Sequence, residues 1–336
     1  MRLAIHHRKG SYSERWIDYC ESNLIEYRLV NAFDSDIINQ LNGYDAFMWH
    51  HHHGKYEDVL AARSILFALE HAGVKVFPNF NTGWHFDNKV AQKYLLEAIE
   101  APLVPSYVFY TKSKAIEWAN QTSYPKVFKL KGGAGSANVK LVKTKSECIK
   151  LIEKSFGKGF KQFDGFEYFL DTLTKYKAGL KNISDVIKAI GRFFISTQFS
   201  KTMGNEKGYV YFQDFMNNND SDLRVIIVDD KAFAIKRMVR ENDFRASGSG
   251  IILYEKNQID ERCVKIAFEV NRKLESQSIA FDFVFDDKDN PRIVEISYGY
   301  AIEAYDYCTG YWDSYLNWHE AHFNPQEWMI KAILRN

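Results

Sequence analysis

The sequence is poor in cysteine and has no long apolar run. Its four cysteines, Cys20, Cys148, Cys263 and Cys308, are scattered without Cys-x-x-Cys spacing, which argues against a zinc site or a disulfide framework. No segment has the unbroken apolar length that spans a bilayer. The apolar stretch near the amino terminus is too short for a secretory signal. We therefore expect a cytoplasmic protein that does not associate with membranes.

The sequence also lacks an excess of charge of either sign. Lys plus Arg number 44 and Asp plus Glu number 43, and no basic run with interleaved aromatics occurs. Nucleic acid is therefore not an expected partner. The 336 residues, 46% of them hydrophobic and 15% aromatic, are enough to fill the cores of two or three domains.

The alternation of apolar and helical patterns predicts three units. Short strands at 3–6, 44–49 and 75–77, with helices at 13–23 and 59–71 between them, predict a parallel α/β domain over residues 1–85. The second unit, 86–207, has predicted helices at 88–100, 113–120 and 145–154, predicted strands at 107–110, 126–131 and 138–142, and a polar helical insertion at about 156–207. The third, 208–336, has predicted strands at 209–215, 223–228, 232–239, 280–285 and 292–297, a helix at 263–277 and an aromatic tail.

A lysine near the end of an apolar strand precedes a glycine-rich loop. Lys129 is followed by Gly132, Gly133, Gly135 and Ser136. Such a lysine suits phosphate oxygens, and the glycines let backbone N–H groups approach them closely. An ordinary hairpin turn is the alternative.

Three other glycine-loop signatures do not fit this stretch. A P-loop needs Gly-Lys-Ser/Thr, and a protein kinase places its lysine after the loop and needs a His-Arg-Asp segment; both patterns are absent. The dinucleotide fingerprint opens a helix, whereas this loop leads into the predicted strand 138–142.

Two carboxylates occur on later strands. The turn at 286–291 has hairpin chemistry, so Asp282 and Glu295 are predicted to lie on adjacent antiparallel strands. Hard oxygen donors on short rigid strands suit the magnesium that accompanies ATP.

Taken in order, these motifs resemble those of the ATP-grasp superfamily, in the branch of glutathione synthetase and the ribosomal-protein glutamate ligase. The resemblance covers about residues 78–300. It implies an α/β and α+β chain with an ATP-grasp fold and an N-terminal Rossmann-like domain.

The resemblance implies two lysines at the phosphates. Lys129 is implied to contact the α- and β-phosphates, and Lys89, at the start of the helix 88–100, to be the earlier family lysine. A cation there neutralises charge that builds on the leaving ADP. Two surface lysines are the alternative interpretation.

The resemblance also implies an adenine hinge and an arginine at the transferred phosphate. The backbone of Asp214 and Phe215 is implied to receive adenine and Asp222 to lie near the sugar, while Arg245 is implied to face the transferred phosphate, with Arg224 and Arg237 as runners-up. The catalytic residues are then Arg245, Lys129 and Arg237, and the nucleotide-binding residues are Lys89, Lys129, Gly132, Gly133, Gly135, Ser136, Gln213, Asp214, Phe215, Asp222, Arg245 and Ser247.

Asp282, Glu295 and Ser297 are implied to hold one or two Mg²⁺ ions, or Mn²⁺ in their place. Most relatives have asparagine where this chain has Ser297, and a hydroxyl is a poorer ligand than an amide oxygen. The number of ions therefore stays open.

The activity that the resemblance implies is ATP-dependent carbon–nitrogen ligation. An amide forms through an acyl phosphate, with ADP and phosphate as products, and no Ser-His-Asp or reactive-cysteine signature is needed. An ATP-grasp small-molecule kinase and a nucleotide-binding protein without turnover are the alternatives. The substrates stay open among amino acids, peptides and uronic acids, and a homodimer is an open option.

Several features have weaker claims. His50–His53 and the loop Arg8–Ser13 each follow a predicted strand, at the end where open α/β sheets bind ligands. The histidines could be a substrate wall, a metal site or a polar loop, and the arginine and lysine of the other loop could hold a carboxylate or phosphate. The aromatic residues of 298–319 could form core or a substrate surface.

Overall fold

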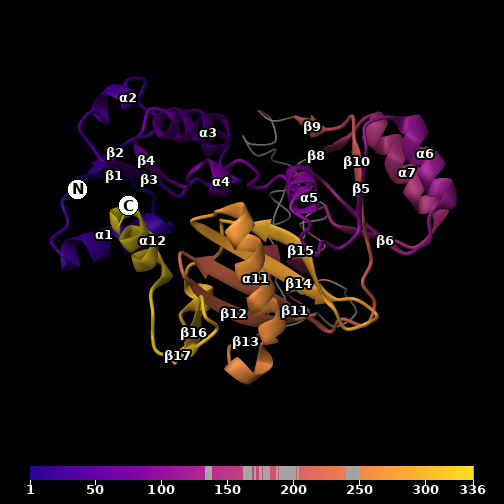
Figure 1. Cartoon of the computed structure of the whole chain (residues 1–336). Coiled ribbons are helices and arrows are strands. Elements are labelled where there is room, and N and C mark those ends of the chain that lie inside the picture. Colours follow the sequence, from indigo (N-terminus) through magenta and orange to yellow (C-terminus); the bar gives the residue numbers. More distant parts are fainter. Residues whose placement is uncertain are drawn as a thin grey trace.

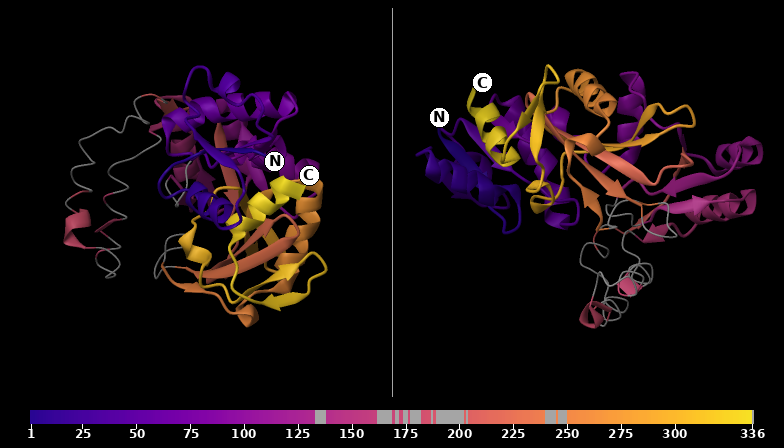
Figure 2. Two further views of the ribbon diagram at one scale, coloured as in Figure 1. Left: turned by 90° about the vertical axis from the view of Figure 1, so that its left-hand side faces the viewer. Right: turned by 90° about the horizontal axis from the view of Figure 1, so that it is seen from below.

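Four β-sheets organise the part of the chain that the structure describes (Figure 1). This computed structural model describes residues 1–132, 138–161, 204–239 and 250–335, together with positions 169, 172, 173, 176, 182–186, 188, 202 and 245. The N-terminal sheet and the sheet that contains β5 and β10 lie at opposite ends of the molecule, and the largest sheet lies between them (Figure 2).

The N-terminal sheet is parallel, with strand order β2-β1-β3-β4. Its strands are β1 (Leu3–His6), β2 (Tyr27–Val30), β3 (Ala46–Trp49) and β4 (Lys75–Phe77), and its helices are α1 (Tyr12–Ser22), α2 (Ile37–Gln40), α3 (Tyr56–His71) and α4 (Phe80–Gly83). Alternate residues of β1 enter different cores: Leu3 and Ile5 pack with α1, while Ala4 packs with α3. Burial on both faces explains why β1 and β3 are apolar almost throughout.

A second sheet is antiparallel, with order β5-β10-β6-β7. It consists of β5 (Ser106–Phe109), β10 (Val210–Asp214), β6 (Lys126–Lys129) and β7 (Lys140–Val142), and it packs against α6 (Lys112–Gln121) and α7 (Lys145–Phe156). Phe128 and Phe212 enter the core beneath these helices. Because side chains alternate along a strand, Lys129 and Gln213 lie on the opposite face.

The third sheet has seven strands, in the order β15-β14-β11-β12-β16-β17, with β13 paired to β12. These are β11 (Ser221–Val228), β12 (Lys231–Met238), β13 (Ile252–Leu253), β14 (Ser278–Phe285), β15 (Pro291–Ser297), β16 (Gly310–Asp313) and β17 (Trp318–Glu320). Helix α11 (Glu261–Leu274) covers one face through an apolar core. The structure also has a two-stranded sheet of β8 (Phe160–Lys161) and β9 (Asn205–Glu206), and two short 3₁₀ helices, Lys256–Gln258 and Glu303–Tyr305.

The other face of the seven-stranded sheet is divided along its length. On β11, Asp222 and Arg224 are followed on the same face by Ile226 and Val228. The two apolar residues belong to a core shared with α1 and α12 (Pro325–Arg335). One half of this face therefore joins the N-terminal unit, and the other half carries charge.

The sheets are not three consecutive blocks of sequence. Strand β10 begins just after position 207 but is hydrogen-bonded between β5 and β6. Helix α5 (Lys89–Ala98) packs on β15, and α12 returns to α1 and β4, which brings the two termini close together (Figure 1). The division at 85/86 and 207/208 stays a prediction. Strand β10 (Val210–Asp214) follows the second boundary in sequence but pairs with strands that precede it.

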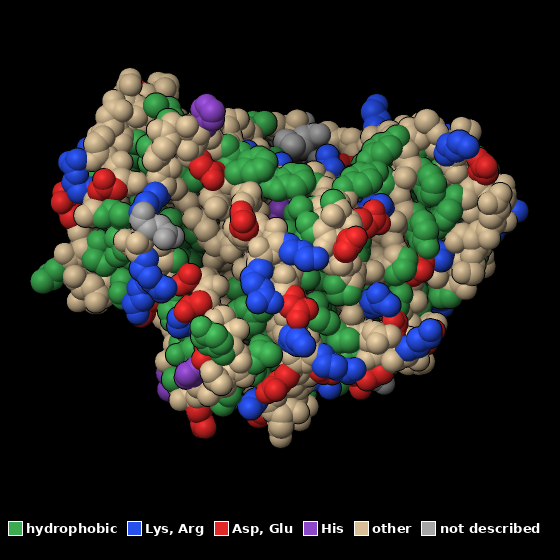
Figure 3. All heavy atoms as spheres, viewed as in Figure 1, with side chains coloured by type: hydrophobic (Ala, Val, Ile, Leu, Met, Phe, Trp, Pro, Cys, Tyr) green, Lys and Arg blue, Asp and Glu red, His purple; other side chains and the backbone are tan. Residues whose placement is uncertain are grey.

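Charges of both signs are interspersed on the surface shown in Figure 3. No large patch of one sign is seen on that face. Among the helices in the described ranges, none combines the length and the apolar character needed to cross a bilayer.

Most of the C-terminal aromatic residues belong to cores. Tyr298, Tyr300 and Tyr305 join the core beneath the N-terminal sheet, and Trp312 packs with α11. Core packing, one of the two interpretations of this stretch, accounts for these four residues.

Replacement of Phe233 by alanine should strongly destabilise the fold. Phe233 is fully buried and its ring lies 5.1 Å from that of Phe323 and 5.4 Å from that of Tyr305. Loss of a buried phenylalanine side chain costs about 3–5 kcal/mol. Chemical denaturation should show this decrease in the free energy of unfolding. Tyr315→Ala, at a position 85% exposed, is the control and should have little effect.

Candidate active site

Two carboxylates face each other on the charged half of the seven-stranded sheet. Asp282 on β14 and Glu295 on β15 are directly paired residues of antiparallel strands, so their side chains project from the same face. The hairpin predicted from the turn chemistry is therefore present. Asp282 is buried, and the Glu295 side chain is 32% exposed.

Asp282 is held by two arginines. Arg224 on β11 donates from Nε to Oδ1 at 2.5 Å and from Nη2 to Oδ2 at 2.6 Å. Nη2 of Arg237 on β12 lies 3.0 Å from the same Oδ2. Burial alone would raise the pKa of Asp282, but the two guanidinium groups outweigh burial and lower it. Asp282 is therefore ionised across the physiological pH range.

Arg237 also binds Asp222, and this places Asp222 within the network. Its Nε and Nη2 donate to the two carboxylate oxygens of Asp222, each at 2.6 Å. Burial raises the pKa of Asp222, and Arg237 opposes that shift. The Asp222 side chain is thus committed to an arginine, whereas the family resemblance implies a position near the sugar.

Lys89 approaches Glu295 from the first turn of α5. Asn88 caps this helix by accepting a hydrogen bond from the Ala91 N–H at 3.1 Å, which sets the direction in which Lys89 leaves the backbone. Its Nζ lies 3.6 Å from Oε2 of Glu295. The Lys89 N–H also donates to the Lys131 carbonyl at 2.9 Å, so the helix start is joined to the glycine-rich loop.

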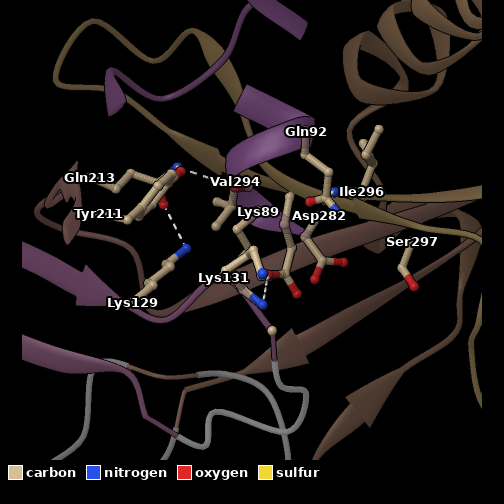
Figure 4. A network of polar contacts seen from close by, with 12 residues as sticks. Lys89, Gln92, Lys129, Lys131, Tyr211, Gln213, Asp282, Val294, Ile296 and Ser297 are labelled. Atoms are coloured by element: carbon tan, nitrogen blue, oxygen red, sulfur yellow. Dashed lines mark hydrogen bonds and ion pairs between the residues drawn. The ribbon is translucent and has the colours of Figure 1, made fainter. Parts of the chain in front are cut away.

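Lys129, on β6 of the antiparallel four-stranded sheet, also lies near the carboxylates of Asp282 and Glu295 (Figure 4). Its Nζ donates to Oε1 of Gln213 at 2.6 Å, and Nε2 of Gln213 donates to the Val294 carbonyl at 3.2 Å. Val294 is the neighbour of Glu295 on β15, so Gln213 joins the two sheets beside the carboxylates.

The pKa of Lys129 is lowered to about 8, mainly by burial and to a smaller extent by Lys89, while Glu295 and Asp282 oppose the shift. The lysine is therefore within electrostatic range of both carboxylates. The side chains of Lys129 (β6), Lys89 (α5), Asp282 (β14) and Glu295 (β15) therefore lie close to one another.

The predicted adenine hinge lies at the end of β10. Asp214 forms an ion pair with Lys126 at 2.6 Å, and its N–H donates to the Pro105 carbonyl at 2.9 Å. Phe215 is half-buried.

The start of the glycine-rich loop already holds a carboxylate. The N–H groups of Lys131 and Gly132 donate to Glu206 at 3.2 and 3.4 Å, and the Lys131 N–H also donates to the Tyr209 hydroxyl at 2.5 Å. A Cβ on Gly132 would meet Asp87 Oδ2 at 3.1 Å. These backbone groups are therefore arranged to bind an anion.

Some predicted residues cannot be placed. Gly133, Gly135, Ser136 and Ser247 lie outside the described residues. Arg245 is half-buried and makes contacts of its own, but its flanking positions lie outside the described part.

The binding of Asp282 by two arginines is not predicted from the sequence. The resemblance implies Arg224 and Arg237 as runners-up at the transferred phosphate, with Arg237 also among the catalytic residues, yet both bind Asp282 directly. The alternation Asp222-Leu223-Arg224 is a readable signal of a charged strand face, but the partners across the sheet depend on register. Glu206 and Tyr209 at the loop were missed as well, and no motif marks them.

The chain matches known proteins over most of its length. Residues 195–310 match the family described as a RimK-like ATP-grasp domain. The chain is 21% identical over 290 residues to the alpha-aminoadipate–LysW ligase LysX of Saccharolobus solfataricus, covering 82% of this chain and 86% of that protein.

Solved structures show the same architecture. The D-alanine–D-alanine ligase of Bacillus anthracis aligns with a TM-score of 0.60 and 15% identity, over 100% of this chain and 98% of that one. A RimK domain ATP-grasp protein from Sphaerobacter thermophilus aligns with a TM-score of 0.52 and 13% identity, over 88% and 90%.

Residues 195–310 are similar to a RimK-like ATP-grasp domain, and the chain has the fold of the ATP-grasp proteins with which it aligns. Both the expected RimK and glutathione synthetase-like branch and the expected mixed α/β fold are confirmed. In this chain, the charged half of the seven-stranded sheet faces the side of the antiparallel sheet β5-β10-β6-β7 that carries Lys129 and Gln213. Lys89 and Lys129 lie between the two sheets.

The donor atoms fit a magnesium ion that is shared with phosphate oxygens. Glu295 has no hydrogen bond from an arginine within the described residues, and Oδ1 of Asp282 accepts one bond from Arg224, which leaves it a lone pair. Ser297 donates its hydroxyl proton to the Gly299 carbonyl at 2.9 Å, so its own lone pairs stay available.

No group of three or more acidic, histidine or cysteine side chains that could hold a metal occurs among the described residues.

Nucleotide affinity should fall as pH rises through about 8. Below the lowered pKa of Lys129, about 8, the lysine is charged and can pair with phosphate; above it the charge is lost. About a tenth of the sites stay protonated one pH unit higher. The dissociation constant of Mg-ADP, measured from pH 7 to pH 9, should rise toward that of Lys129→Met, whose weak binding should vary less with pH.

The matched control for this variant is Lys265→Met, at an exposed position on α11. It should retain the wild-type profile. Equal profiles in wild type and Lys129→Met would contradict the assignment of Lys129 to the phosphates.

Proposed function

We propose that this ATP-grasp protein is an ATP-dependent carboxylate–amine ligase. The observation that carries the proposal is the convergence of Lys89 and Lys129 on the opposed carboxylates of Asp282 and Glu295. Cations on one side suit the phosphates, and oxygen donors on the other suit the metal.

In the proposed reaction, an oxygen of the substrate carboxylate attacks the γ-phosphorus of ATP and ADP leaves. A neutral amine then attacks the carbon of the resulting acyl phosphate, phosphate departs, and the amine nitrogen loses a proton as the amide forms. Lys129 and Lys89 hold the phosphates and offset the charge that develops on ADP. Arg245 is proposed to face the transferred phosphoryl group.

Magnesium, held by Glu295, Asp282 and Ser297, would supply charge neutralisation at the phosphate oxygens. Gln213 positions Lys129 and ties the four-stranded sheet to β15. The remaining nucleotide contacts are proposed for Gly132, Gly133, Gly135, Ser136, Asp214, Phe215, Asp222 and Ser247.

The named relatives support this class of reaction. LysX is named as a ligase that joins alpha-aminoadipate to LysW, and the Bacillus anthracis protein as a D-alanine–D-alanine ligase. We propose small-molecule or peptide substrates for this chain and a location in the cytoplasm, which agrees with its four free cysteines.

Loss of either a proposed phosphate-binding lysine or a proposed metal-binding carboxylate should strongly reduce turnover. Lys129→Met and Glu295→Gln should each lower ADP formation by about 100-fold or more, the size of effect seen when one transition-state contact is removed. ADP release is measured over a panel of carboxylate and amine pairs. Lys265→Met and Glu269→Gln, both at exposed positions of α11, are the matched controls and should retain full activity.

The same assay separates the alternatives. ADP release that needs the amine supports the ligase, and release that needs only a hydroxyl acceptor supports a kinase. Tight ATP binding without ADP formation in any mixture would support a binding protein. Full activity in Lys129→Met or Glu295→Gln would refute the site.

Divalent metal should bind together with nucleotide rather than before it. The carboxylates of Asp222, Asp282 and Glu295 are surrounded by the cations of Lys89, Lys129, Arg224 and Arg237, so the empty network attracts a cation weakly. Titration of Mn²⁺ followed by electron paramagnetic resonance should show at least a tenfold gain in affinity on addition of a nonhydrolysable ATP analogue, beyond binding to the analogue alone. Equal affinity with and without nucleotide would contradict this arrangement.

A further inference from the structure

Two loops meet at the carboxyl edge of the N-terminal sheet. Strands β1 and β3 are parallel neighbours, and their last residues, His6 and Trp49, are paired. The loop that begins at His7 and the histidine segment His50–His53 therefore leave the sheet side by side. Ligands bind at this edge in open α/β sheets.

Arg8 is held in place by its backbone, and its side chain has no hydrogen bond or ion pair to the part of the chain that the structure describes. Its N–H donates to Ser13 Oγ at 3.1 Å, and its carbonyl accepts from the Ser11 N–H at 3.1 Å. Its Nε is buried without a hydrogen bond. A guanidinium that is partly desolvated and unpaired is costly, so this position favours an anionic ligand.

The acidic residue near Arg8 offsets its charge only from a distance: burial raises the pKa of Asp58, and the His52 N–H and the charge of Arg8 oppose that shift. Asp58 is buried and accepts the His52 N–H at 2.6 Å. Within the described part of the chain, no ion pair joins Asp58 to Arg8. Asp58 instead fixes the backbone of the histidine segment.

Two histidines beside Arg8 present hydrogen-bond donors. Nδ1 of His50 accepts the Tyr12 N–H at 3.1 Å, and Nδ1 of His52 accepts the Gly54 N–H at 3.0 Å. Burial, with a smaller contribution from Arg8, lowers the pKa of both rings, that of His52 to about 4. Each ring is therefore neutral, and since its Nδ1 is an acceptor, its Nε2 carries the proton.

The two ends of the histidine segment respond to different charges. His50 and His52 are influenced by Arg8. His53 is influenced by Lys89 and Glu295, which belong to the proposed phosphate and metal site. The histidine segment is therefore within electrostatic range of Arg8 at one end and of Lys89 and Glu295 at the other.

We propose that Arg8, with the Nε2–H groups of His50 and His52, binds a carboxylate of the substrate that is not the one activated by ATP. A carboxylate held by three donors is a weak nucleophile, so this group anchors the substrate while a second carboxylate reaches the reaction centre past His53. The substrate is then a small molecule or peptide end with two carboxylates separated by a short chain. This inference rests on the proposed ligase function and identifies its acid substrate by class.

The test is the binding of simple dicarboxylates to the full chain. Calorimetric titration with succinate and glutarate, compared with acetate at equal ionic strength, should show tighter binding of the dicarboxylates to the wild type. Arg8→Gln should weaken dicarboxylate binding by about tenfold or more, as expected for loss of a forked charge-assisted contact. Arg8→Lys keeps the charge without the fork and should retain part of the affinity. Arg28→Gln, an exposed arginine on β2, is the matched control and should behave as the wild type.

Two results would overturn the proposal: unchanged dicarboxylate affinity in Arg8→Gln, or a wild type that does not prefer dicarboxylates to acetate.

Mg-ADP binding separates this inference from the function on which it rests. Arg8→Gln should bind Mg-ADP as the wild type does. Failure of the wild type to bind Mg-ADP would count against the ligase, whereas the dicarboxylate titration would still decide the role of Arg8.

Discussion

The opposed carboxylates of Asp282 and Glu295 set the condition that the rest of the site meets. Like charges directly across a strand pair are unfavourable unless cations compensate them. Arginines of β11 and β12 neutralise Asp282 within the sheet itself. Glu295 is compensated from outside, by Lys89 of α5 and by Lys129 of the facing sheet. The two sheets are thus joined electrostatically at the point where a metal-bound phosphate would be held.

This arrangement depends on how one sheet face is shared. Along β11, charged residues at one end give way to Ile226 and Val228 at the other, and these pack with the N-terminal unit and α12. The N-terminal domain is therefore fixed by an apolar core beside the charged network. Its histidine segment lies next to Lys89 and Glu295 for that reason, which places a second set of polar groups at the same centre.

Local sequence patterns predicted the strongest elements. The strands at 126–131, 223–228 and 280–285 and the helix at 263–277 correspond to β6, β11, β14 and α11, with ends that differ by a few residues. Strand β2 was not predicted, because Tyr27–Val30 is an exposed edge strand whose conformation comes from pairing with β1. The place of β10 was not readable either, since it inserts between β5 and β6 through long-range hydrogen bonds.

The resemblance to the ATP-grasp superfamily and the chemical character of the site can be read from the order of the residues, because a lysine before glycines and two carboxylates around a hairpin are local features of the chain. Which charges meet depends on the folded arrangement. Asp282 pairs with Arg224 and Arg237 through strand register, Lys129 binds Gln213 on the neighbouring strand, and Nε of Arg8 is buried without a hydrogen bond to the described residues. Pairing of this kind depends on distances between residues far apart in the chain, and no local pattern encodes those distances.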